Sequence, residues 1–141
     1  MRLEFSDKKQ FTSVGSPPRS YPILPITLVG LHSRSVKTFA LLDTGADSTL
    51  LHSRWGLQIG LNVTSGRRVS FGGIDPKTEM WGYEHRITVV VAQKRIRCNV
   101  TFCSDIGDES TDQLIGRETI FDNLRFALRQ SVGLLYTDTI P

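Results

Sequence analysis

Residues 40–51 read ALLDTGADSTLL, so an apolar run ends in Asp43 and a second apolar run begins after a tight turn. An aspartate between two apolar runs is expected to be at least half buried, and a buried carboxylate requires hydrogen bonds or a counter-charge. Gly45 lets the backbone turn sharply and donate its N–H to the carboxylate without a Cβ in the way. Thr44 offers a short hydroxyl that suits pairing with a symmetry mate or with nearby backbone. The alternative is an ordinary β-turn between strands, and the flanking apolar runs favour the buried arrangement.

A second apolar pair followed by glycine occurs at Leu114-Ile115-Gly116-Arg117 and leads directly into a helix predicted at 118–124. Taken alone, this element is also typical of a strand that ends at a glycine before a helix, with no function attached. Between the two elements lie strands predicted at 67–71 and 81–92, joined by a glycine-bearing tip at 72–77. Both elements in this order, with a hairpin between them, are much less probable by chance than either element alone.

Extended patterns dominate the rest of the chain, and the predicted fold class is all-β. Further strands are expected at 21–29, 36–42 and 95–103, and a closing hairpin at 125–129 with 134–136. The prolines of the first of these strands suit an edge or a strand start. Apolar residues alternate in 95–103, which places Cys98 on a buried face. A single helical turn, opened by a serine cap, is predicted at 53–57.

These motifs resemble the retropepsin-like aspartic proteases, the single-domain relatives of retroviral proteases, and most closely their small bacterial members. The resemblance covers residues 21–136 and implies a closed-barrel-like acid protease fold with one short C-terminal helix. It implies that Asp43 is the catalytic aspartate and that Leu114-Ile115-Gly116 packs behind its loop. Arg117 is implied to pair with Asp47, and Thr44 to join a hydroxyl grip between subunits. The implied active-site support residues are Thr44, Gly45, Ala46, Asp47, Gly116 and Arg117. The implied flap residues, which close over substrate, are Phe71, Gly72, Gly73 and Ile74; Trp81 is a further candidate, equally well explained by packing.

The activity implied by the resemblance is that of an aspartic endopeptidase, which hydrolyses peptide bonds as a homodimer. In such an enzyme one ionised carboxylate activates a water while a second, protonated carboxylate polarises the scissile carbonyl. The chain holds one Asp-Thr-Gly, because Asp138-Thr139 is followed by Ile140, so it supplies half of such a site. Ala46 stands where some relatives carry serine, and activity is expected to extend from acidic pH toward neutrality. The alternatives are a non-catalytic dimeric domain that binds peptides or scaffolds an assembly, and a basic β-domain that binds nucleic acid.

Composition bounds the remaining possibilities. The 141 residues, 39% of them hydrophobic, are predicted to form one domain at 21–141 after a flexible lead-in at 1–20. The net charge of +3 is spread along the chain, and its densest basic spots lack aromatic platforms for bases, so no nucleic-acid partner is expected. Apolar runs stay far below the ~20 residues that span a bilayer. No membrane association is therefore expected, and the lack of a secretory pattern near the N-terminus predicts a cytoplasmic protein.

Cys98 and Cys103 are expected to be reduced thiols. No cofactor or metal is predicted, since the histidines His32, His52 and His85 have no ligand spacing.

Overall fold

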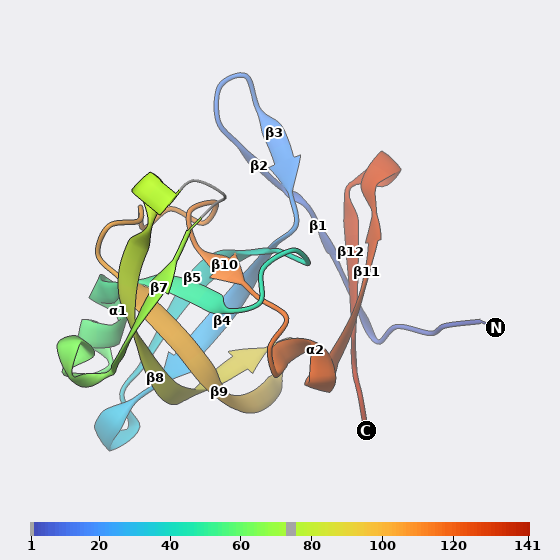
Figure 1. Cartoon of the computed structure of the whole chain (residues 1–141). Coiled ribbons are helices and arrows are strands. Elements are labelled where there is room, and N and C mark those ends of the chain that lie inside the picture. Colours follow the sequence, from blue (N-terminus) through green and yellow to red (C-terminus); the bar gives the residue numbers. More distant parts are fainter. Residues whose placement is uncertain (1, 73–75) are drawn as a thin grey trace.

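The computed structural model describes residues 2–72 and 76–141, and it is mostly β, as predicted (Figure 1). The described strands form three sheets, of seven, three and two strands. The two α-helices are short: α1 spans Ser53–Gln58 and α2 spans Ile120–Asn123. Single 3-10 turns occur at η1 (Leu31–Ser33), η2 (Val63–Ser65), η3 (Pro76–Thr78) and η4 (Gln130–Val132). None of the helices in the described part of the chain has the length and apolar character needed to cross a membrane.

The seven-stranded sheet carries the two motifs and the hairpin between them. In spatial order its strands are β4 (Ile23–Val29), β5 (Ser35–Leu42), β10 (Leu114–Ile115), β6 (Thr49–His52), β9 (Lys94–Cys103), β8 (Met80–Val91) and β7 (Arg67–Phe71). The short β10 runs parallel to β5 and antiparallel to β6, so it lies between the two strands that flank the Asp43 loop. The predicted hairpin is present as β7 and β8, with Phe71 opposite Met80.

The prolines of this strand were expected at an edge or at a strand start. The strand start applies, because Pro22 precedes β4 and Pro25 lies near its beginning, whereas β4 is not an edge strand, since it also pairs with β8. This additional pairing covers only Ile26–Val29. Pro25 lies just before that segment, opposite Phe39 of β5. Because it has no partner on β8, its missing N–H removes no hydrogen bond to that strand. Proline is therefore accommodated at the point where the strand has one neighbour instead of two.

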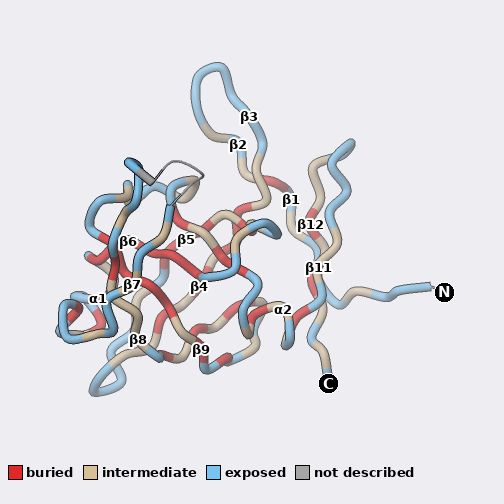
Figure 2. Tube along the Cα trace, viewed as in Figure 1, coloured by how far each residue is buried: buried red, intermediate tan, exposed pale blue. Residues whose placement is uncertain are grey.

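The core lies between the layers of the large sheet, and buried residues follow its strands through the body of the molecule (Figure 2). The predicted alternation in β9 is confirmed: its buried apolar face consists of Ile96, Cys98, Val100 and Phe102. Thr101, expected on the solvent side, is also buried, because Gly82 of β8 lies directly against it. Both cysteines are free, as predicted, and Cys98 is buried, as the alternation predicted. Cys103, whose burial was not predicted, is buried as well.

The N-terminal segment differs from the flexible lead-in that was expected at 1–20. Strand β1 (Asp7–Gln10) pairs with β12 (Leu134–Thr139), which pairs in turn with β11 (Leu124–Arg129) to complete the predicted closing hairpin. Phe11 is only 7% exposed, and its N–H donates to the carbonyl of Gly133 at 2.7 Å. These contacts make the segment part of the folded structure. The chain then forms the two-stranded hairpin of β2 (Thr12–Val14) and β3 (Arg19–Tyr21), which projects from the body in Figure 1.

Both predicted helices are confirmed, but each begins differently from the expectation. Helix α1 is capped by His52 instead of a serine, because its Nδ1 accepts the N–H of Arg54 at 3.0 Å. Helix α2 begins at Ile120 instead of Glu118, because Thr119 has a φ of 66° and cannot continue a right-handed helix backward. The segment before α2 is instead free to bond the Asp43 loop.

Candidate active site

Asp43 lies where β5 ends, and its backbone and side chain are both held. Its N–H donates to the carbonyl of Ile115 at 3.1 Å, and its carbonyl accepts the N–H of Ala46 at 3.3 Å. Its Oδ1 accepts the N–H of Gly45 at 2.9 Å, which is the bond predicted from the sequence. The side chain is half-buried, as expected, whereas Thr44 is exposed. The carboxylate is therefore oriented by the turn that follows it.

The loop that follows Asp43 is fastened to the segment after β10. The N–H of Arg117 donates to the carbonyl of Ala46 at 2.9 Å, and the N–H of Glu118 donates to that of Asp47 at 2.8 Å. The N–H of Gly116 donates to the Thr49 hydroxyl at 3.2 Å. The expectation that the second apolar-glycine element packs behind the loop is confirmed by these bonds.

Gly116 is the closest point of approach between the two segments. A Cβ at this position would lie 2.3 Å from the carbonyl oxygen and 2.4 Å from the carbonyl carbon of Ser48. Both are backbone atoms, which cannot rotate out of the way as a side chain can. Glycine is thus required here by the contact itself.

The predicted ion pair between Arg117 and Asp47 is present. It joins the loop to the segment that leads into α2. Both side chains are mostly exposed, at 53% for Arg117 and 82% for Asp47, so solvent screens the attraction. The backbone bonds between the two segments are therefore the firmer connection.

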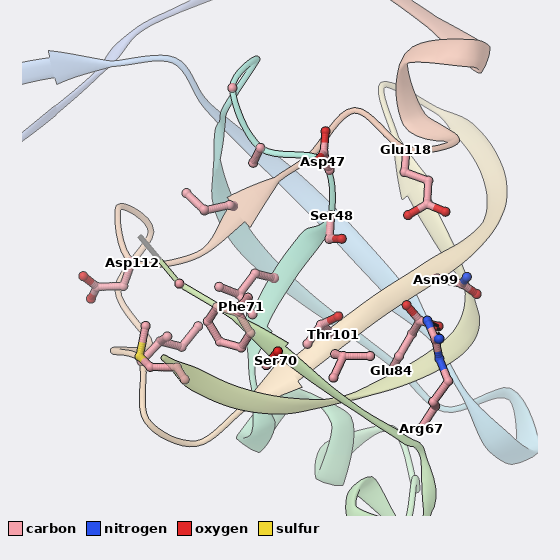
Figure 3. Close-up of a pocket in the computed structure, with 18 residues that line it drawn as sticks. Asp47, Ser48, Arg67, Ser70, Phe71, Glu84, Asn99, Thr101, Asp112 and Glu118 are labelled. Carbon is pink, nitrogen blue, oxygen red and sulfur yellow. Dashed lines mark hydrogen bonds and ion pairs between the residues drawn. The ribbon is translucent and has the colours of Figure 1, made fainter. Parts of the chain in front are cut away.

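A pocket of about 810 Å³ lies between this loop and the β7–β8 hairpin (Figure 3). The described residues that line it are Gly45, Ala46, Asp47, Ser48, Leu50, Arg67, Val69, Ser70, Phe71, Gly72, Met80, Glu84, Asn99, Thr101, Ile106, Asp112, Leu114 and Glu118. One of these lining residues is Gly45, whose N–H donates to the Asp43 carboxylate. Loop, hairpin and the Gly116 segment thus converge on one hollow.

The hairpin residues predicted to contact substrate divide into three groups. Phe71 and Gly72 line the pocket. Gly73 and Ile74 lie outside the described residues. Trp81 is 41% exposed and is not part of the pocket lining; the Arg68 guanidinium lies 4.1 Å from its ring centroid. The assignment of Trp81 as a flap contact is therefore not supported by its position.

Charged side chains give the pocket a mixed polar wall. The carboxylates among the described lining residues belong to Asp47, Glu84, Asp112 and Glu118. Arg67 of β7 pairs with Glu84 of β8 at 2.9 Å, and this ion pair ties the two strands of the hairpin together beside the pocket (Figure 3). The acidic residues Asp105, Asp108, Glu109 and Asp112 lie in a largely exposed loop. Within this loop Asp112 lines the pocket and Asp108 binds Arg54. The Arg54 hydrogen bond lowers the pKa of Asp108 below its usual 3.8.

Sequence reasoning missed Gln113, which is fully buried and hydrogen-bonded on both sides of β10. Nothing in the local pattern separates it from the polar residues before it. Two of the histidines have structural partners: His85 Nε2 lies 2.7 Å from the carbonyl of Val63, and His52 caps α1. Within residues 2–72 and 76–141, no group of three or more His, Cys, Asp or Glu side chains is arranged to hold a metal ion.

Comparison with known proteins adds no family assignment. No protein-family model matches the chain, and no curated protein matches it in sequence. Function is therefore inferred from the chemistry of the site. Gly45, Ala46 and Asp47 line the pocket, whereas Asp43 itself is not among its lining residues. The half-buried Asp43 carboxylate, oriented by a backbone N–H, can accept a proton from a bound water.

Proposed function

We propose that the chain is a retropepsin-like aspartic endopeptidase that hydrolyses peptide bonds as a homodimer, on a closed-barrel-like acid protease fold. The observation that supports this most directly is the setting of Asp43. Its carboxylate accepts the Gly45 N–H at the end of a core strand, and its loop is bonded to the Gly116 segment. A binding or scaffold domain has no need of a carboxylate held in this way.

One chain supplies one Asp-Thr-Gly, and the chemistry requires two carboxylates. In the proposed dimer, ionised Asp43 removes a proton from a water whose oxygen attacks the scissile carbonyl carbon. The partner subunit's Asp43, protonated, donates a hydrogen bond and then its proton to the carbonyl oxygen. When the tetrahedral intermediate collapses, the C–N bond breaks and a proton passes to the leaving amine. The products are a carboxylic acid and an amine, and the pair of carboxylates again shares one proton.

The substrate class follows from the pocket and its hairpin. Strand β7 is the last strand in the order of the large sheet, and Arg67, Val69 and Phe71 of this strand line the pocket. An extended peptide can add to such a strand by main-chain hydrogen bonds, while pockets receive alternate side chains. A volume of about 810 Å³ offers room for several residues of an extended peptide.

The test is cleavage of a mixed peptide library between pH 4 and 7 by wild type and by Asp43→Asn. Asp122→Asn is the matched control, because Asp122 is an exposed aspartate on α2 outside the pocket lining. We expect cleavage by wild type and by the control, inhibition by a statine peptide, and no cleavage by Asp43→Asn. Folded wild type that cleaves nothing would favour the non-catalytic peptide-binding alternative.

The requirement for two copies has its own test. Asp43→Asn is refolded together with an equal amount of wild type, so that subunits combine at random. If each site needs both aspartates, mixed dimers are inactive. The mixture should then show about half the activity of the same amount of wild type refolded alone. Addition of Asp122→Asn in the same way leaves the activity undiminished. An activity unaffected by Asp43→Asn would show that one chain carries a complete site.

A further inference from the structure

Gln113 carries a side-chain amide that is 0% exposed and sits immediately before β10. Its Nε2 donates to the Thr38 hydroxyl at 3.1 Å and to the carbonyl of Phe39 at 3.0 Å, both on β5. Its Oε1 accepts the N–H of His52 at 2.9 Å, at the end of β6. The amide nitrogen therefore binds β5 and the amide oxygen binds β6, which are the two neighbours of β10.

The main chain at the same position adds a fourth connection. The N–H of Leu41 donates to the carbonyl of Gln113 at 2.9 Å, two residues before Asp43. Strand β10 is only two residues long, with Leu114 opposite Leu41 and Leu50 and Ile115 opposite Leu42. So short a strand makes few ladder bonds of its own, and Gln113 supplies the bonds that hold its start in register.

We infer that Gln113 is a positioning residue for Asp43, an inference that rests on the proposed peptidase function. The carbonyl that accepts the Asp43 N–H belongs to Ile115, two residues beyond Gln113. The bonds to Ala46 and Asp47 begin at Arg117, two residues further on. A shift of β10 along β5 therefore moves every anchor of the Asp43 loop together, and misplacement by about 1 Å is enough to cost on the order of 100-fold in rate.

Gln113→Met is the first test variant, because methionine keeps the length of the side chain but removes its donors and its acceptor. We expect kcat for the best library peptide to fall on the order of 100-fold. We expect KM to change much less than kcat, because the hairpin side of the pocket is not bonded to Gln113. We also expect the amide hydrogens of Asp43 and His52 to exchange about 10-fold faster, as each loses a bond or its alignment.

Gln113→Glu is the second variant and tests rescue. When protonated, glutamic acid still accepts from His52 and donates to one acceptor on β5; when ionised, it has no donor and is a buried charge. The ratio of variant to wild-type kcat is therefore expected to rise as pH falls from 7 to 4.5. Among the residues bonded to Gln113, His52 carries the titratable side chain, and wild type measured at the same pH corrects for it.

Thr38→Val is the matched control, because it removes one buried partner of the same amide and leaves the bonds to Phe39 and His52. It is expected to lose stability but to keep wild-type kcat per folded molecule. The inference is overturned if Gln113→Met and Thr38→Val have equal kcat and equal exchange at Asp43. Inactive wild type would refute the proposed function instead, and unchanged exchange at Asp43 in Gln113→Met would then still refute the positioning role.

Discussion

Replacing Gly116 by alanine perturbs the contact on which the candidate site depends most closely. The added Cβ would lie 2.3 Å from the carbonyl oxygen of Ser48, whereas non-bonded heavy atoms normally approach to about 3.5 Å. The two segments must therefore separate by about 1 Å, or the backbone must tilt by an equivalent amount. Either movement pulls the N–H groups of Arg117 and Glu118 away from the carbonyls that they now bond at 2.9 and 2.8 Å.

The expected loss of stability follows from these two effects. Overpacking in a filled interior costs about 1–3 kcal/mol. Each weakened hydrogen bond adds up to about 1 kcal/mol. We expect Gly116→Ala to lower the free energy of unfolding by about 3 kcal/mol, a large share of the ~5–15 kcal/mol typical of a domain.

Urea denaturation at a fixed protein concentration measures this loss, since association would otherwise shift the midpoint. Gly45→Ala is the matched control: it makes the same change in the loop that faces Gly116, but its Cβ would meet nothing nearer than the Asp43 Oδ1 at 3.3 Å. We expect that control to change stability by less than about 1 kcal/mol. Equal midpoints for wild type and Gly116→Ala would refute the reasoning, because the clash would then be relieved without cost.

Three further predictions concern regions outside the Gly116 contact. Phe11→Ala should lower the free energy of unfolding by about 3 kcal/mol in urea denaturation, because a buried ring is removed. An unchanged free energy of unfolding would show that residues 1–20 are a dispensable lead-in. Burial raises the pKa of the Cys98 thiol to about 11. The contribution of this thiol to stability should therefore be constant below about pH 9 and fall by about 1 kcal/mol per pH unit between there and pH 11, and Cys98→Ala should remove this slope. The hydrogen bond from Arg125 lowers the pKa of Asp138 below 3.8. The contribution of Asp138 to stability is therefore present at neutral pH and lost as pH falls through that lowered value. Acid denaturation of Asp138→Asn should lack this step.

Local patterns were enough to predict the elements whose neighbours lie close in sequence. The turn after Asp43 and its bond from Gly45 span three residues, and alternation alone located the buried face of β9. The pairing of Arg117 with Asp47 came from the family resemblance, because no local pattern connects residues so far apart.

The features that were missed depend on distant neighbours. Strand β1 is ordered by pairing with β12, and Ser6 bonds the carbonyl of Thr137 across a separation of 131 residues. Gln113 lies in a polar segment, so nothing local predicts its burial. Its partner Thr38 lies 75 residues earlier in the sequence. The start of α2 was misjudged because no local pattern predicts the positive φ of Thr119 or the bond from the Glu118 N–H to Asp47, 71 residues earlier.

The separations that define the site also determine when it can form during folding. The bond from Gly116 to Thr49 closes 67 residues, the pair of Arg117 with Asp47 closes 70, and the bond from Gln113 to Thr38 closes 75. Such closures are costly in chain entropy and are expected late, after the hairpins that lie between them in sequence. A growing chain that has not yet extended past Arg117 can fold β4–β5 and β7–β9 but holds Asp43 without its anchors. Under the proposed peptidase function, Asp43 thus acquires its full set of anchors only when the fold is nearly complete.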